Sequence, residues 1–89
     1  MPVNIEVFSA PGCNSCGQAK KVIRKLVEQM GDDRLQWREV NVVAELDYAV
    51  ELGILSTPAI AINGELIFTG LPSEKKLHAE LLKQLETGL

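Results

Sequence analysis

The chain has 89 residues, of which 46% are hydrophobic and 24% charged, and its formal net charge is −3 at pH 7. This length makes one small domain, residues 1–89, whose core is large enough to fold without a metal or a structural disulfide. The mildly acidic balance argues against nucleic acid or an anionic membrane as the partner. The first residues lack the basic segment and long apolar stretch of a leader or membrane span, so we expect a cytoplasmic protein.

The first third of the chain predicts a strand followed by a helix. Apolar and polar residues alternate over residues 3–8, which is typical of a strand, and Pro11 and Gly12 then turn the chain. From residue 13 to residue 30 the apolar positions recur in steps of three and four, which predicts an amphipathic helix. Gly31 is placed to end this helix.

The next segment, residues 35–43, is rich in strand-forming residues but alternates imperfectly. Leu35 and Trp37 share one phase, whereas Val40 and Val42 take the other. A β-bulge, or a strand that begins later, would explain the change of phase. We expect Trp37 to be a packing residue.

The second half predicts two helices around a hairpin. Residues 44–52 have the broad apolar face of a short helix. Residues 59–62 are continuously apolar, as in a strand buried on both faces, and Asn63-Gly64 is a strong hairpin signal that leads into a strand over residues 65–69.

The last helix begins after Ser73, a favourable N-cap residue, and Gly88 follows its expected end. Its apolar stripe is formed by Leu77, Leu81, Leu82 and Leu85. The complete order is therefore β-α-β-α-β-β-α. A right-handed crossover makes the first two strands parallel and the tight turn makes the last two antiparallel, so we expect an α/β fold with a four-stranded mixed sheet flanked by three helices.

Both cysteines of the chain, Cys13 and Cys16, lie where the first strand gives way to the first helix. Helix positions three apart are neighbours, close enough for a disulfide after a small adjustment. The first turn of a helix also carries free N–H groups and a partial positive charge, which stabilise a thiolate. This position favours redox chemistry.

Two other uses of the cysteine pair remain open at this point. A structural disulfide across so short a loop stabilises a fold by only about 2 kcal/mol. A zinc site needs three or four protein ligands, whereas the chain has two cysteines and one histidine, His78. Two thiolates alone suit a soft metal ion such as Cu(I), which makes a metal carrier the competing interpretation.

The first helix has a basic face formed by Lys20, Lys21, Arg24 and Lys25. Such a face is most simply a solvated surface. It also fits a basic patch beside the cysteines that attracts acidic partners.

The C-x-x-C after the first strand, together with Thr57-Pro58 just before a hairpin strand, resembles the thioredoxin/glutaredoxin superfamily in its minimal form. The resemblance implies that Cys13 is the exposed nucleophile and Cys16 the buried resolving thiol. It also implies a cis Thr57–Pro58 bond that faces the cysteines and lets the Thr57 backbone pair with an extended substrate. Gly12 and Gly70 are expected to line the same substrate site.

The chain departs from the family at several positions. Asn14-Ser15 between the cysteines matches neither the Gly-Pro of many thioredoxins nor the Pro-Tyr of many glutaredoxins. Val7 stands where thioredoxins carry a buried Asp that accepts the proton of the second thiol. Glu6 and Glu39 are nearby carboxylates, but we expect each to be an exposed strand residue.

The loop after the last strand bears on the choice of substrate. Gly70-Leu71-Pro72 lacks the second glycine that glutaredoxins use for glutathione, and no basic residue precedes the C-x-x-C. We therefore expect a monomeric oxidoreductase that reduces protein disulfides through a Cys13/Cys16 dithiol–disulfide cycle and binds no cofactor or metal. A thioredoxin-reductase-type flavoenzyme or another thiol would regenerate it. The alternatives are a glutathione-linked oxidoreductase and a Cu(I) carrier.

Overall fold

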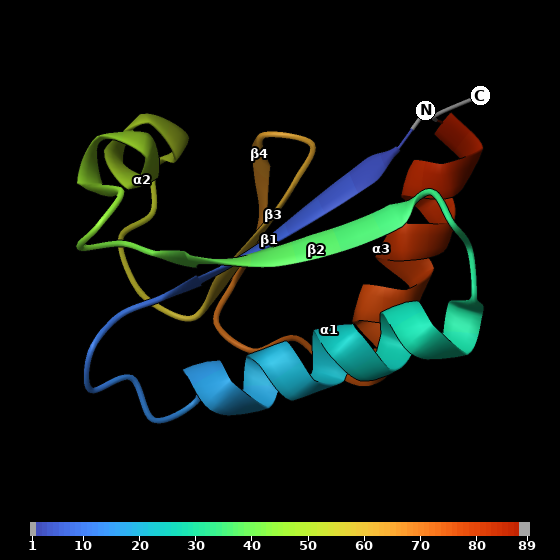
Figure 1. Ribbon diagram of the computed structural model, residues 1–89, viewed down its shortest axis with the longest axis horizontal. Coiled ribbons are helices and arrows are strands. Elements are labelled where there is room, and N and C mark those ends of the chain that lie inside the picture. Colours follow the sequence, from blue (N-terminus) through green and yellow to red (C-terminus); the bar gives the residue numbers. More distant parts are fainter. Residues whose placement is uncertain (1, 88–89) are drawn as a thin grey trace.

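The computed structural model describes residues 2–87 (Figure 1). Its elements are β1 (Val3–Ser9), α1 (Cys16–Met30), β2 (Leu35–Asn41), α2 (Leu46–Leu52), β3 (Ala59–Ile62), β4 (Glu65–Thr69) and α3 (Glu74–Thr87). The β-α-β-α-β-β-α order predicted from the sequence is confirmed.

The four strands form one mixed sheet in the order β2-β1-β3-β4. β1 runs parallel to β2 and antiparallel to β3, and β3 and β4 form the predicted hairpin. Asn63 and Gly64 at its turn have φ values of 52° and 81°. Two consecutive positive φ values are what a two-residue hairpin with the right-handed twist of its strands requires.

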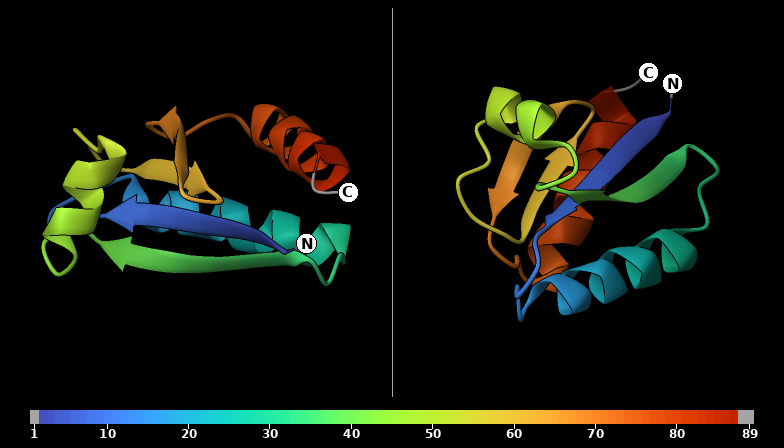
Figure 2. Two further views of the ribbon diagram at one scale, coloured as in Figure 1. Left: turned by 90° about the horizontal axis from the view of Figure 1, so that it is seen from above. Right: turned by 60° about the vertical axis from the view of Figure 1, so that its left-hand side comes forward.

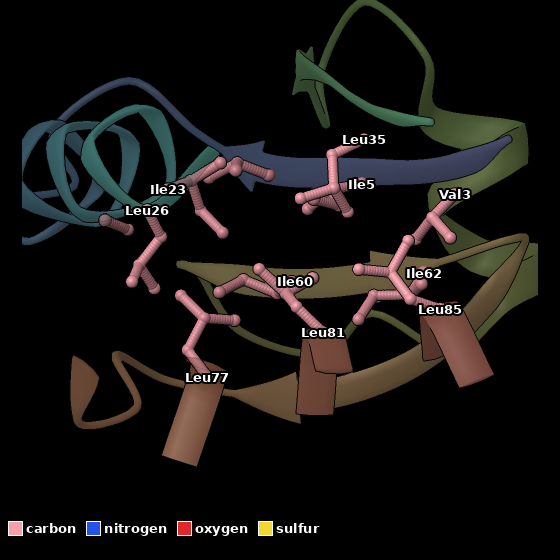
Figure 3. Close-up of a cluster of buried hydrophobic side chains, with 12 residues drawn as sticks. Val3, Ile5, Ile23, Leu26, Leu35, Ile60, Ile62, Leu77, Leu81 and Leu85 are labelled. Carbon is pink, nitrogen blue, oxygen red and sulfur yellow. The ribbon is translucent and has the colours of Figure 1, made fainter. Parts of the chain in front are cut away.

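Helices cover both faces of the sheet. α1 and α3 lie against one face, where a cluster of buried side chains joins them to the strands (Figure 3). The labelled members of this cluster are Val3, Ile5, Ile23, Leu26, Leu35, Ile60, Ile62, Leu77, Leu81 and Leu85. α2 packs on the other face over a smaller cluster formed by Phe8, Val40, Ala49, Ala59 and Ala61. In the left view of Figure 2, the short α2 lies at the end of the sheet opposite to the C-terminal end of α3.

The two-sided cover explains the mixed pattern of β2. Leu35 and Trp37 pack toward α1 and α3, whereas Val40 packs toward α2, so apolar residues are buried in both phases. Both explanations considered for the change of phase, a bulge and a strand that begins later, are wrong, because β2 begins at Leu35 and its register with β1 runs without a shift. β2 ends at Asn41, whose Oδ1 accepts bonds from the N–H groups of Val43 and Ala44 at 2.8 and 3.2 Å.

α1 begins at Cys16, three residues later than the periodicity predicts. The Cys13 N–H donates to the Ala10 carbonyl at 3.2 Å, and Gly12 adopts a φ of 80°, so the segment before Cys16 is a turn. This turn keeps Cys13 outside the helix. The other end is as predicted: Gly31, at a φ of 59°, donates its N–H to the Val27 carbonyl.

α3 begins with the predicted cap, because the Ser73 hydroxyl accepts the N–H of Lys76 at 3.2 Å. Its apolar stripe is narrower than expected. Leu77, Leu81 and Leu85 are buried, but Leu82 is 46% exposed and does not belong to the core. Gly88, expected to follow the end of this helix, lies outside the described residues. Within residues 2–87, no helix has the length and apolar character needed to cross a membrane.

Candidate active site

Cys13 and Cys16 form a disulfide with an S–S distance of 2.12 Å and a Cα–Cα distance of 5.6 Å. Cys13 lies in the loop after β1 and is partly exposed. Cys16 is the first residue of α1 and is only 4% exposed. The two bonded cysteines therefore differ in how exposed their residues are to solvent.

The buried cysteine sits between a helix terminus and the end of β1. Its Sγ lies 3.9 Å from the carbonyl oxygen of Phe8. The first turn of α1 contains no acidic residue, so no side chain of that turn neutralises the unpaired N–H groups at this terminus. These groups provide a local positive potential for a cysteine thiolate after reduction.

The Thr57–Pro58 peptide bond is cis, and Pro58 is buried. Ala59, the first residue of β3, pairs with Phe8 near the end of β1. Pro58, which directly precedes Ala59, therefore lies at the end of β1 where the loop to Cys13 begins. The Pro58 carbonyl accepts the N–H of Gly70 at 2.8 Å. The fold thus brings the ends of β1 and β4, the start of β3 and the start of α1 to the same end of the sheet.

Gly12 and Gly70, the two glycines expected to line the substrate site, lie in loops at this end of the sheet, after β1 and after β4. Their φ values are 80° and 89°, in the left-handed region that favours glycine. Space around each is open, because a Cβ added there would meet no heavy atom within 4 Å beyond the adjoining residues. Backbone conformation, and not crowding, therefore accounts for glycine at these positions.

One exposed apolar residue near the site was missed by the sequence reasoning. Leu55, two residues before Thr57, is 95% exposed. The loop also joins α2, whose outer side carries the exposed Leu46 and Val50. A leucine in a loop rich in Ser, Thr and Pro, outside any helical or strand period, was the available signal.

The position of the usual buried Asp is apolar here, since Val7 is fully buried in the core beneath α1. The expectation that Glu6 is an exposed residue is wrong, because Glu6 is only 7% exposed. It accepts bonds from Arg38 at 3.0 and 2.6 Å and from the Tyr48 hydroxyl. This hydrogen bond from Tyr48, together with burial, raises the pKa of Tyr48.

Glu39 is largely exposed but not isolated, and its partners connect it to the cysteine region. It accepts the Ser9 hydroxyl at 2.8 Å and the Lys20 ammonium at 3.0 Å. The bonds from Lys20 and Ser9 lower the pKa of Glu39, so this carboxylate is ionised at neutral pH. Ser9 directly follows Phe8, and Lys20 lies one helical turn beyond Cys16.

A metal site would need further ligands beside the cysteine pair. Among residues 2–87, no group of three or more His, Cys, Asp or Glu side chains is placed to hold a metal ion. His78 is exposed on α3.

Comparisons with known proteins point to one family. Residues 3–83 match the family model described as a thioredoxin domain. A probable thioredoxin from Methanothermobacter thermautotrophicus is 35% identical over 86 residues, which cover 97% of this chain and 100% of that protein. A thioredoxin from Methanocaldococcus jannaschii is also 35% identical, over 83 residues that cover 93% of this chain and 96% of its own length.

Solved structures agree in fold. A mutant thioredoxin from Halobacterium salinarum superposes with a TM-score of 0.76 at 22% identity, covering 91% of this chain and 73% of that one. Thioredoxin 1 from Thermosipho africanus superposes with a TM-score of 0.75 at 17% identity, covering 96% and 97%. These matches favour neither a glutathione-linked enzyme nor a metal carrier. With its Cys13–Cys16 disulfide at the start of α1, the chain belongs to the thioredoxin family and is a protein thiol–disulfide oxidoreductase.

Proposed function

We propose that Cys13 is the attacking thiol and Cys16 the resolving thiol of this oxidoreductase. The observation that carries the assignment is the unequal exposure of two bonded cysteines, since Cys16 is 4% exposed whereas Cys13 is partly open to solvent. A substrate disulfide can approach the sulfur of Cys13 from solvent, and only a neighbour already in contact can reach Cys16.

The reaction starts from the reduced dithiol. The Cys13 thiolate attacks one sulfur of the substrate disulfide, a Cys13–substrate bond forms, and the other substrate sulfur leaves as a thiolate that takes up a proton. Cys16 loses its proton and attacks the Cys13 sulfur. The Cys13–Cys16 bond forms and the second substrate thiol leaves, so two electrons and two protons have passed to the substrate.

Substrate contact is assigned to the loops around the cysteines. The backbone of Thr57, held next to the buried Pro58, is proposed to pair with an extended substrate segment. Gly12 and Gly70 are proposed to line the approach, because glycines without side chains leave backbone groups accessible there.

A protein disulfide is the favoured substrate and a thioredoxin-reductase-type flavoenzyme the favoured electron donor, in a reducing compartment such as the cytoplasm. Support comes from the thioredoxin relatives and from the loop of Gly70, Leu71 and Pro72, which lacks the second glycine of a glutathione site. Turnover with glutathione and its reductase, without turnover through a thioredoxin reductase, would overturn this choice of donor.

The cysteine roles are tested with two single substitutions and a disulfide-bonded protein substrate, using protein that has been reduced with dithiothreitol and then freed of it. Cys13→Ser is expected to abolish reduction, because no nucleophile remains exposed. Cys16→Ser is expected to accumulate a mixed disulfide between Cys13 and the substrate, visible by mass and reversible with excess thiol. Ser15→Ala, an exposed change in the same loop, is the matched control and should retain activity. Full activity of the Cys13→Ser protein would contradict the mechanism.

A further inference from the structure

A groove runs along the outer side of the molecule between α1 and β2. It encloses about 480 Å³ and begins at Gly17, the residue that follows Cys16. Its lining includes the side chains of Lys20, Lys21, Arg24, Trp37 and Glu39. We call it the α1–β2 groove. Its proximity to Cys16 follows from the chain itself, since Gly17 is bonded to the buried cysteine.

The α1–β2 groove is positively charged although the whole chain carries a net charge of −3. Lys21 and Arg24 are exposed, and within residues 2–87 neither forms an ion pair. The third cation, Lys20, is bound by the one carboxylate of the groove, Glu39, at 3.0 Å. Two uncompensated cations therefore face solvent over the half-buried indole of Trp37.

Other basic residues nearby are engaged elsewhere. Lys25, part of the basic face predicted from the sequence, pairs with Glu74 of α3 at 3.6 Å. Arg38 also borders the groove, but its guanidinium binds Glu6 and Glu45 at 2.6 and 3.6 Å. The free positive charge is thus concentrated at Lys21 and Arg24.

We propose that the α1–β2 groove binds an acidic segment of the protein whose disulfide is reduced, close to the cysteine that Cys13 attacks. This inference rests on the proposed function and adds the chemical class of its substrate. An acidic protein is repelled by the net charge of this chain at long range. A local patch of opposite charge on the helix that begins at Cys16 offsets that repulsion and increases the association rate.

The helix geometry gives the spacing that such a substrate needs. Arg24 lies eight residues after Cys16, which corresponds to about 12 Å along the helix axis. An extended peptide advances about 3.3 Å per residue. Lys21 lies five residues after Cys16, about 7.5 Å along the axis, so acidic residues about two to four positions from the substrate cysteine would lie over Lys21 and Arg24. β2 is an edge strand, so the outer side of the groove has no further strand against it among residues 2–87.

The test compares two peptides with the same internal disulfide, flanked on both sides by glutamates in one and glutamines in the other. The rate constant for reduction by the dithiol form of the protein is measured for each. We expect the acidic peptide to react about tenfold faster at about 0.02 M salt, and the advantage to disappear at about 0.5 M salt because the charges are screened.

Charge reversal locates the effect. The double variant Lys21→Glu with Arg24→Glu should lose the preference for the acidic peptide and keep the native rate with the neutral one. The matched control, Lys76→Glu with Lys83→Glu on exposed positions of α3, changes the net charge equally and should keep the preference.

Three results would overturn a part of the interpretation. Equal rates for the two peptides with the native protein would refute the groove as an acidic site while leaving the proposed function intact. An equal loss of preference in the α3 control would show that net charge, not the groove, selects the substrate. Failure of the native protein to reduce either peptide would instead contradict the proposed function.

Discussion

At the scale of single residues, the charge closest along the chain to the cysteine pair is that of Lys20, which is paired with Glu39. The ammonium lies one helical turn beyond Cys16, and the carboxylate neutralises it at 3.0 Å. Ser9 holds the same carboxylate from the end of β1. The Lys20–Glu39 pair is exposed to solvent, so salt screens it and its electrostatic effect on the cysteines is modest.

We expect opposite effects from removing the two partners of this pair. A unit charge at about 10 Å in water contributes about 0.4 kcal/mol, which changes a thiolate population about twofold. Once the disulfide has been reduced and the reductant removed, Lys20→Met should therefore slow alkylation of Cys13 by iodoacetamide at neutral pH about twofold. Glu39→Gln, which leaves the ammonium unpaired, should accelerate it by a similar factor. Changes of the same sign in both variants would contradict an electrostatic role.

At the scale of elements, α2 is held to the sheet by a polar contact as well as by its apolar side. Ala49 is its one buried residue, and Leu46 and Val50 face solvent. Tyr48 adds a second attachment, because its hydroxyl donates to the buried Glu6 of β1 while its ring lies 5.8 Å from that of Phe8. A short helix with so little buried surface depends on such an anchor.

The anchor predicts a pH dependence of stability. The hydrogen bond to Glu6 and burial raise the pKa of Tyr48 in the folded protein. A raised folded pKa means that this contribution is complete below the unfolded value of about 10 and is lost as the pH rises through the folded value. Tyr48 is the only tyrosine, so absorbance titration reports it directly.

Glu6→Gln should move that titration toward the ordinary tyrosine value and lower the free energy of unfolding by about 1–3 kcal/mol, because Arg38 and Tyr48 lose a charged acceptor. Glu45→Gln is the matched control. It removes only the exposed partner of Arg38, which pairs at 3.6 Å, and should cost about 0–1 kcal/mol. An unchanged Tyr48 titration in the Glu6 variant would contradict the anchor.

At the scale of the whole molecule, the main core lies between the sheet and the pair α1 and α3 (Figure 3). α3 contributes Leu77, Leu81 and Leu85, spaced by one helical turn, which places the three side chains over the sheet. Because this face of the sheet also supports α1, the position of Cys16 depends on the same core.

Two neighbouring leucines of α3 test this packing. Leu81 is completely buried, so Leu81→Ala should reduce the free energy of unfolding by about 2–5 kcal/mol. Leu82 is 46% exposed, and Leu82→Ala should change it by less than about 1 kcal/mol. Denaturant unfolding at neutral pH measures both. Similar losses would mean that α3 packs on the sheet through a different face.

The order of elements, the hairpin and the position of the cysteine pair follow from the sequence alone, because each depends on local signals. A period of three and four defines α1, Asn63-Gly64 defines the hairpin turn, and Ser73 caps α3. The roles of Cys13 and Cys16 as nucleophile and resolving thiol were expected from the family resemblance, are supported by their unequal exposure, and stay predictions.

Other features required the tertiary structure because they depend on contacts between distant segments. The mixed pattern of β2 arises from burial on two faces, and Glu6 is buried only because Arg38 and Tyr48 come to it from β2 and α2. The pairing of Lys25 with Glu74 across two helices likewise separates it from the α1–β2 groove. Local sequence determined which elements form and where the cysteines lie along them. The packing of those elements decided which charged side chains are paired and which stay unpaired.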